Sequence, residues 1–245
     1  MTLTEQQIQN YRQKGYHLFG RLLSDEETDL LAKIYLDCLE LTNRDPSQSV
    51  SDIRPEKTDA NIYQLRCAHL MHEAFDAVVR NKHLLDIVED LIGPNIRLIL
   101  CQGLYKPPHT GDAIKWHQDN QYFQVNKPDG VVSCWLTLDD ATVDNGCMWV
   151  SPGAHTKPLP HDTISTGLHI PNIDESNILP LEMKRGHCML HHGLMPHRTL
   201  ANKTSSHRRA LAIHYMDATA QLPEGRRNEP PQNIPIIRGD ATSLA

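Results

Sequence analysis

The spacing of apolar residues changes from helical to strand-like near residue 96. Before that point, apolar residues recur as they do on one face of a helix. The pattern predicts helices over residues 5–16, 25–43 and 68–92, and a short strand over residues 16–23. Thr4 with Gln7 and Ser24 with Glu27 fit the capping box that starts a helix, and a Gly-Pro pair follows the third helical segment.

After residue 96 the apolar runs are short, β-rich and separated by Pro, Gly, Asn and Asp, which is typical of strands. The clearest runs are residues 96–105, 130–140, 146–152, 187–193 and 208–216. Helices come first and do not alternate with the strands. This order favours an antiparallel sandwich or barrel braced by N-terminal helices.

Two segments show neither the helical nor the strand-like spacing of apolar residues. Residues 44–62 are polar and contain two prolines, so we expect a surface loop. Residues 156–180 read as a long irregular insertion of the kind that often carries function. We expect one domain with a mostly helical support, a strand core and an extended C-terminal tail, over residues 1–95, 96–218 and 219–245.

Composition narrows the class of protein. The chain has 245 residues, of which 39% are hydrophobic and 22% charged, and its formal net charge is −6. No Lys/Arg-rich run offers a basic surface, so we expect neither nucleic acid nor a membrane as a partner. The six cysteines are scattered through apolar runs as reduced thiols are, and the N-terminus lacks signal-peptide features, which together favour a cytoplasmic protein. Nothing in the sequence indicates an oligomeric state.

The stretch KWHQDNQYF places His117 and Asp119 two residues apart. If the stretch is extended, both side chains leave the same face and offer one nitrogen and one oxygen ligand. A facial-triad Fe(II) site needs one more histidine and leaves three positions open. Taken alone, an H-x-D tripeptide is more often a surface pair, so the site requires a further ligand elsewhere.

A second cluster supplies histidines and arginines, His191, His192, His197, Arg208 and Arg209. In a strand, Arg208 shares its face with Ala210 and Ala212, which leave room in front of the guanidinium. Such a planar fork in a pocket suits a carboxylate. The alternative is that Arg208 and Arg209 begin a solvated strand.

Three segments in this order resemble the phytanoyl-CoA dioxygenase (PhyH) family of Fe(II)/2-oxoglutarate oxygenases. They are WHQDNQYF, CWLTLDDATVDNGCMWVSPGAH and HHGLMPHRTLANKTSSHRRA. The likeness extends from the N-terminal helices to about Met216. It implies a mainly β fold, a double-stranded β-helix (jelly roll, cupin-like) braced by the N-terminal helices.

The resemblance also implies a ligand set and a co-substrate site. His117, Asp119 and His197 match the family's iron ligands, because His197 precedes a small hydroxyl residue, Thr199, and the family's arginine, Arg208, at the family's spacing. Arg208, with Thr199 beside it, is expected to pair with the far carboxylate of 2-oxoglutarate.

Two further positions, Gln102 and Trp135, line the co-substrate pocket in relatives, although both also fit simple packing. The sequence departs from the family where some relatives place a co-substrate lysine, since Gln64 stands near that point. His187, His191 and His192 are expected as core or supporting residues, and His155 fits either a substrate contact or a cap of its loop. We regard Gln118, Gln121, Tyr122 and Trp149 as weak candidates for substrate contact.

The resemblance implies an enzyme that uses Fe(II), 2-oxoglutarate and O2 to hydroxylate an unactivated carbon of a small molecule, with release of succinate and CO2. Halogenating relatives have a small residue where this chain has Asp119, so hydroxylation is favoured over halogenation. Two alternatives stay open. One is a zinc-dependent hydrolase or isomerase on a similar barrel, and the other is a non-catalytic protein that binds the metal or 2-oxoglutarate.

Overall fold

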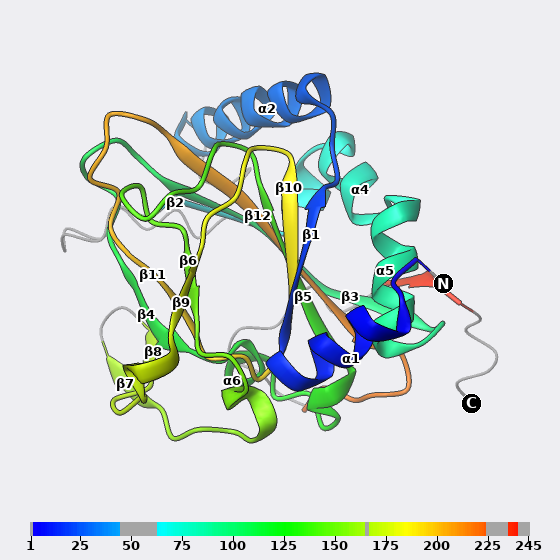
Figure 1. Cartoon of the computed structure of the whole chain (residues 1–245). Coiled ribbons are helices and arrows are strands. Elements are labelled where there is room, and N and C mark those ends of the chain that lie inside the picture. Colours follow the sequence, from blue (N-terminus) through cyan, green and yellow to red (C-terminus); the bar gives the residue numbers. More distant parts are fainter. Residues whose placement is uncertain (1, 45–62, 165–166, 224–234, 240–245) are drawn as a thin grey trace.

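Two larger antiparallel sheets, a two-stranded hairpin and a layer of helices make up the computed structural model, which describes residues 2–44, 63–164, 167–223 and 235–239 (Figure 1). Helices α2, α4 and α5 cover one face of the larger sheet, and the smaller sheet lies toward its other face (Figure 1). The expected jelly roll braced by N-terminal helices is confirmed. None of the helices in the described ranges has both the length and the apolar character of a membrane span.

The larger sheet has the strand order β1-β10-β5-β12-β3-β13, and β2 also pairs with β3. In that order the strands are β1 (Tyr16–Arg21), β10 (His187–His192), β5 (Val131–Thr137), β12 (Arg208–Asp217), β3 (Ile96–Lys106), β13 (Ile236–Arg238) and β2 (Tyr63–Arg66). The smaller sheet contains β4 (Ile114–His117), β11 (His197–Thr199), β6 (Met148–Val150) and β9 (Leu179–Leu181). A separate hairpin pairs β7 (Asp162–Ile164) with β8 (Gly167–His169).

The helices are α1 (Glu5–Lys14), α2 (Asp25–Arg44), α3 (Ala68–Met71), α4 (Glu73–Val79), α5 (Lys82–Ile92) and α6 (Asp119–Phe123). Both expected capping boxes form, at Thr4 and at Ser24. The helical segment expected over residues 68–92 is divided into three helices. His72 is extended and accepts the N–H of Ala74, and Asn81 accepts the N–H of Leu84, so each residue restarts the helix.

Alternation along the strands separates two apolar layers. On β12, Leu211, Ile213 and Tyr215 pack with the helices, whereas Ala210 and Ala212 face the second core between the sheets. Trp135 on β5 lies in that inner core. All six cysteine side chains are buried.

The expected irregular insertion over residues 156–180 is corrected by the structure, because the hairpin β7–β8 and most of β9 lie within it. The expected loop over residues 44–62 falls almost entirely outside the described residues. In the C-terminal tail, β13 pairs with the start of β3. The N-terminal strand β2 pairs with residues 102–105 on the same edge of β3. Short strands therefore cover two stretches of one edge of β3.

Candidate metal centre

His117 and His197 are brought together by strand pairing. They are direct register partners in the antiparallel pair β4–β11. Asp119 reaches them because Gln118 is extended, with φ −115° and ψ 131°, before α6 begins at Asp119. The two-residue spacing therefore places both side chains of the H-x-D motif on one side, as expected.

The three side chains converge closely enough to hold a metal ion. One ligand atom from each lies within 4.8 Å of the others. Asp119 Oδ1 is 3.7 Å from His117 Nε2 and 3.6 Å from His197 Nε2. All three residues are buried or nearly so. Two imidazoles and one carboxylate form the donor set of an open facial site.

Backbone carbonyls orient both imidazoles. His117 Nδ1 lies 2.8 Å from the carbonyl of Lys115, and His197 Nδ1 lies 2.9 Å from that of Met195. A carbonyl only accepts, so Nδ1 carries the proton in each ring and Nε2 keeps its lone pair. This is how proteins commonly fix a metal-binding histidine.

The charge balance also suits a cation. Burial, and then the neighbouring His197, lower the pKa of His117 to about 3, and burial lowers the pKa of His197 to about 4. Burial alone would raise the pKa of Asp119, but His197 and His214 hold it well below its usual range. At neutral pH the centre therefore offers two neutral imidazoles and one carboxylate, the protonation states that coordinate metals.

A buried arginine without a hydrogen-bond partner for most of its fork lies on the inner face of β12. Arg208 is 1% exposed, its Nε and Nη2 have no partner among the described residues, and Nη1 makes only a 3.4 Å contact with the carbonyl of Leu104. Burial lowers its pKa to about 10, so the guanidinium stays charged at neutral pH. A buried cation in this state requires an anion.

Other polar atoms in this core also lack partners within the described ranges. They are Thr199 Oγ1 and Trp135 Nε1, and the Arg208 guanidinium lies 5.7 Å from the Trp135 ring. Lys106 is the register partner of Arg208, is fully buried, and donates to the carbonyls of Leu200 and Asp112. The Arg208 cation and two unpaired donors thus suit a carboxylate ligand such as 2-oxoglutarate.

Gln102 lies on the same sheet but contacts a histidine. Its Nε2 is 3.4 Å from His214 Nε2. Its assignment to the co-substrate pocket, like that of Trp135, stays a prediction. Gln64 pairs with Leu104 through β2 and β3.

The remaining histidines take supporting positions. His191 Nε2 is 3.7 Å from Asp119 Oδ2. His192 contacts Asp129 at 3.2 Å, and its ring centroid lies 5.1 Å from that of His155. His187 is the register partner of Arg21 at the far end of β10.

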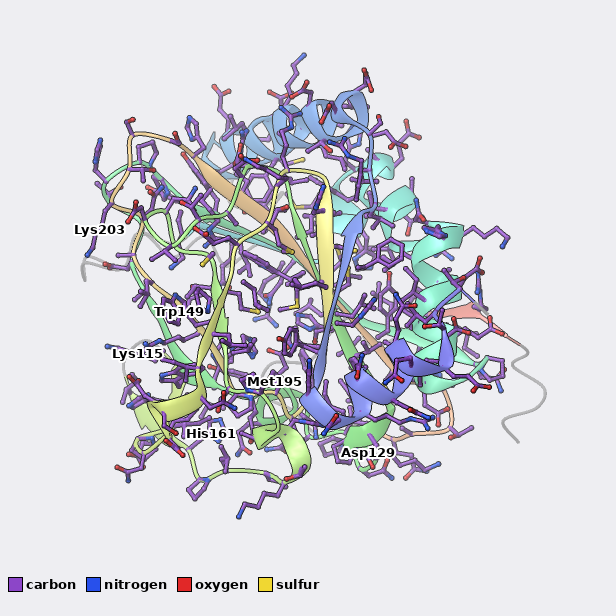
Figure 2. The ribbon with its side chains drawn as sticks, in the orientation of Figure 1. Lys115, Asp129, Trp149, His161, Met195 and Lys203 are labelled. Carbon is purple, nitrogen blue, oxygen red and sulfur yellow. The ribbon has the colours of Figure 1, made fainter. Side chains whose placement is uncertain are left out.

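The insertion over residues 156–180 is tied to the centre by Gln118. The Gln118 side chain donates to the carbonyls of Lys157 and Leu194 and accepts the N–H of Leu159. Its backbone N–H donates to His161, which lies between α6 and the β7–β8 hairpin (Figure 2). The Gln118 side-chain amide therefore makes its hydrogen bonds within the protein. The ring centroid of Tyr122 lies 5.8 Å from that of His117.

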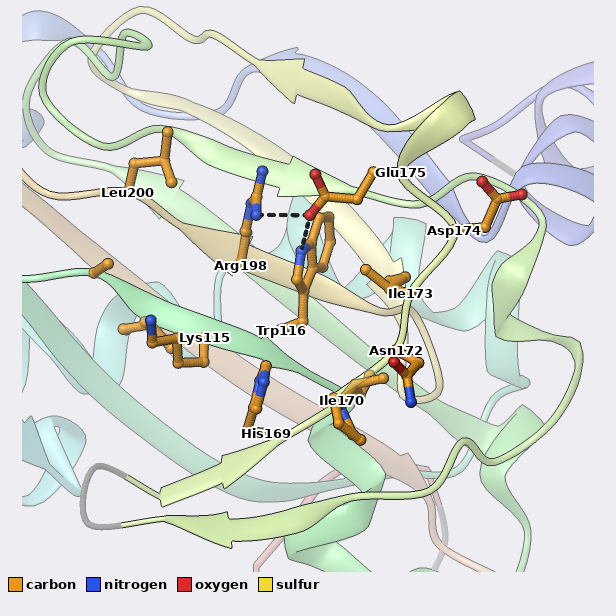
Figure 3. Close-up of a pocket in the computed structure, with 13 residues that line it drawn as sticks. Lys115, Trp116, His169, Ile170, Asn172, Ile173, Asp174, Glu175, Arg198 and Leu200 are labelled. Carbon is orange, nitrogen blue, oxygen red and sulfur yellow. Dashed lines mark hydrogen bonds and ion pairs between the residues drawn. The ribbon is translucent and has the colours of Figure 1, made fainter.

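A cavity of about 570 Å³ lies on the other face of the smaller sheet (Figure 3). Trp116 and Arg198 line it, and each adjoins a candidate ligand in sequence, so strand alternation turns them away from the metal centre. Arg198 lies 4.7 Å from the Trp116 ring and bonds Glu175 at 3.0 Å. Trp149 pairs with Arg198 and shares this outer face (Figure 2).

Sequence reasoning missed three polar residues beside the centre. Ser133 donates to Asp119 Oδ2 at 2.8 Å, His214 Nδ1 lies 3.4 Å from the same oxygen, and Lys106 adjoins Arg208. By strand alternation, Ser133 shares its face of β5 with Trp135, and His214 shares its face of β12 with Arg208. Polar residues on those apolar faces were the available signal.

Known proteins share this sequence pattern and fold. The chain is 34% identical over 120 residues to Phytanoyl-CoA dioxygenase 1 of Oryza sativa subsp. japonica, covering 46% of this chain and 42% of that protein. It is 28% identical over 231 residues to a probable alpha-ketoglutarate-dependent hypophosphite dioxygenase of Stutzerimonas stutzeri, covering 88% and 79%. The alignments span 42% to 56% of the length of the first three curated relatives.

Solved structures show the same fold. The epimerase SnoN, in complex with Fe3+, alpha ketoglutarate and nogalamycin RO, superposes with a TM-score of 0.74 at 24% identity. The match covers 96% of this chain and 93% of that one. Residues 11–210 match the phytanoyl-CoA dioxygenase (PhyH) family. The chain belongs to the phytanoyl-CoA dioxygenase family.

Proposed function

We propose that this protein is an Fe(II)- and 2-oxoglutarate-dependent oxygenase that hydroxylates an unactivated carbon of a small molecule. The observation that carries the proposal is the combination of an open His117–Asp119–His197 centre with the buried, unpaired guanidinium of Arg208. A facial set leaves three of six positions vacant, enough for a chelating co-substrate and O2.

The overall reaction balances as substrate R–H, 2-oxoglutarate and O2 giving R–OH, succinate and CO2. When bound, the iron and 2-oxoglutarate supply the oxidising chemistry. His117 Nε2, His197 Nε2 and Asp119 would hold the metal, and Arg208 and Thr199 would hold the far carboxylate of 2-oxoglutarate. Burial of these groups excludes water and strengthens the charge pairing.

Two relatives support this choice of cofactors. One is named as an alpha-ketoglutarate-dependent dioxygenase, and SnoN was solved with Fe3+ and alpha ketoglutarate. SnoN is an epimerase, so the outcome of the reaction varies among proteins of this fold. Asp119 fills the position that halogenating relatives leave open, which favours hydroxylation.

The unpaired arginine separates this proposal from the zinc-dependent hydrolase or isomerase. The chemistry of a zinc hydrolase or isomerase does not require a carboxylate beside the buried Arg208 guanidinium. The far carboxylate of 2-oxoglutarate would provide the anion that this guanidinium lacks. A non-catalytic protein would bind the same ligands without turnover.

The test begins with binding. Protein loaded anaerobically with Mn(II), a redox-stable substitute, is titrated with 2-oxoglutarate by calorimetry. Fe(II)-loaded protein is then screened against small molecules by succinate release. We expect 2-oxoglutarate to bind only with metal, and succinate to form only with Fe(II), O2 and a substrate.

Specific outcomes overturn the proposal. Zn(II)-dependent turnover that ignores 2-oxoglutarate favours the hydrolase or isomerase. Failure of 2-oxoglutarate to bind the metal-loaded protein excludes both the oxygenase and the non-catalytic 2-oxoglutarate-binding protein. Tight binding without succinate formation across the screen favours the non-catalytic protein.

A further inference from the structure

The two oxygens of Asp119 lie in different surroundings. Oδ1 faces the Nε2 atoms of His117 and His197, at 3.7 and 3.6 Å. Oδ2 points the other way, where Ser133 Oγ donates to it at 2.8 Å and His214 Nδ1 lies 3.4 Å away. One oxygen is therefore available to a metal, and the other is engaged by the sheet.

The contact to Oδ2 is the end of a hydrogen-bond chain. A carboxylate only accepts hydrogen bonds, so the Ser133 hydroxyl donates to Asp119 Oδ2. The same hydroxyl oxygen accepts from His214 Nδ1 at 2.7 Å. Nδ1 then carries the imidazole proton, and His214 Nε2 accepts from Gln102 Nε2 at 3.4 Å. Every donor in the chain meets an acceptor, with one consistent direction toward Asp119.

The chain runs across three neighbouring strands of the larger sheet. Gln102 lies on β3, His214 on β12 and Ser133 on β5, and His214 is the register partner of Ser133. Ser133 is 1% exposed and His214 is 2% exposed. Because strands hold these residues, the chain is rigid, whereas Asp119 itself begins a short helix.

We propose that Ser133 and His214 are positioning residues that hold Asp119 so that only Oδ1 faces the metal. The inference rests on the proposed function, since it gives that site its open coordination. A second oxygen on the metal would occupy one of the three positions that the co-substrate and O2 require. Gln102 supports this chain by fixing the tautomer of His214.

Four variants separate positioning from simple packing. Ser133→Ala and His214→Leu remove the donors. Ser133→Thr keeps the hydroxyl, and His214→Asn places an amide N–H near the position of Nδ1. The readout is the dissociation constant for Mn(II) without 2-oxoglutarate, with the electronic spectrum of the Co(II) form reporting coordination number.

We expect Ser133→Ala and His214→Leu to weaken Mn(II) binding by roughly 10- to 100-fold, the usual effect of removing a group that orients a ligand. Their Co(II) spectra should differ from the wild-type spectrum, because a released Asp119 can exchange its second oxygen for a water on the metal. Ser133→Thr and His214→Asn should restore most of the affinity. Wild-type Mn(II) affinity and Co(II) spectrum in Ser133→Ala overturn the proposal.

A cycle with Asp119→Ala shows whether the effect passes through Asp119. Adding Ser133→Ala in that background should cause no further loss of Mn(II) affinity, and an equal further loss overturns the proposal. If His214→Leu does not fold, as judged by circular dichroism, Ser133→Ala decides alone because it removes one oxygen. None of these measurements needs turnover, so an absence of succinate formation by wild-type protein contradicts the proposed function and leaves this inference standing.

Discussion

His117 and His197 occupy the same position of the β4–β11 ladder, and their ring centroids lie 4.2 Å apart. Without a cation, two nitrogen lone pairs and the Asp119 carboxylate face one another in a buried space. The protein should therefore be stabilised by a divalent metal. A ligand at 100 times its dissociation constant adds about 2.7 kcal/mol to the free energy of unfolding.

We expect Mn(II) to raise the melting temperature of the wild-type protein and not that of Asp119→Ala or His197→Ala. Differential scanning calorimetry with and without the metal measures this. His187→Ala, which removes a histidine outside the centre, is the matched control and should keep the shift. An undiminished shift in His197→Ala would contradict the ligand assignment.

Arg208 should control the affinity for 2-oxoglutarate. A hydrogen bond to a charged group contributes ~1.5–3 kcal/mol, so Arg208→Ala should weaken 2-oxoglutarate binding by roughly 10- to 150-fold. Mn(II) affinity should stay unchanged, because Arg208 is not a metal ligand. Calorimetric titration of 2-oxoglutarate into Mn(II)-loaded protein tests this.

The control for Arg208 is Arg21→Ala, which removes an arginine from an exposed pair with Asp25. It should leave both affinities at the wild-type values. Equal 2-oxoglutarate affinity in Arg208→Ala and wild type would remove the basis of the co-substrate assignment.

Acid should destabilise the protein in part through His192. Burial, and then the neighbouring His155, lower the pKa of His192 from 6.5 to about 4. The unfolded state takes up this proton at higher pH than the folded state, so the stability is present above about pH 6.5 and is lost as the pH falls toward 4. A shift of this size corresponds to something on the order of 3 kcal/mol.

Urea unfolding between pH 7 and pH 4 measures this loss. His192→Asn keeps an acceptor for the N–H of Leu194 and should show a shallower fall in the free energy of unfolding. His109→Asn is the control, because His109 is exposed and its φ of 58° is tolerated by asparagine. Equal slopes in His192→Asn and wild type would refute the prediction.

The pair Arg198–Glu175 should anchor the insertion to the outside of the smaller sheet. Glu175 accepts from both Arg198 and Trp116. The pair is partly exposed, so Arg198→Ala should cost less than about 1 kcal/mol of global stability. Hydrogen exchange of residues 170–175 should nevertheless become faster.

Lys184→Ala, which breaks an exposed pair with Asp140, is the control for Arg198→Ala. It should leave exchange over residues 170–175 unchanged. Wild-type protection of that segment in Arg198→Ala would show that the ion pair does not hold it.

The inner and outer faces of β5 and β12 could be predicted because alternation in a strand is strict. That reasoning placed Arg208 on the same face as Ala210 and Ala212, as the structure has them. The third candidate metal ligand was harder to predict from the residues. Spacing alone offered three histidines, and only the register of β4 with β11 brings His197 to His117.

The sequence gives only weak signals for the short strands and for the contacts between strands. The strands β7, β8 and β9 have three residues each, too few for a periodic pattern to stand out within residues 156–180. The contact from Ser133 to His214 depends on the register between β5 and β12, which no single strand reveals. Polar residues on an apolar face indicated a partner and did not identify it.

The edge of β3 that faces away from β12 is covered by two short strands. β2 and β13 occupy its backbone hydrogen-bonding groups, and Arg238 ties β13 to Asp86 and Glu89 of α5. An uncovered strand edge invites another chain to add to the sheet. By lying against β3, a distant piece of the C-terminal tail thus covers backbone groups to which another chain could otherwise pair.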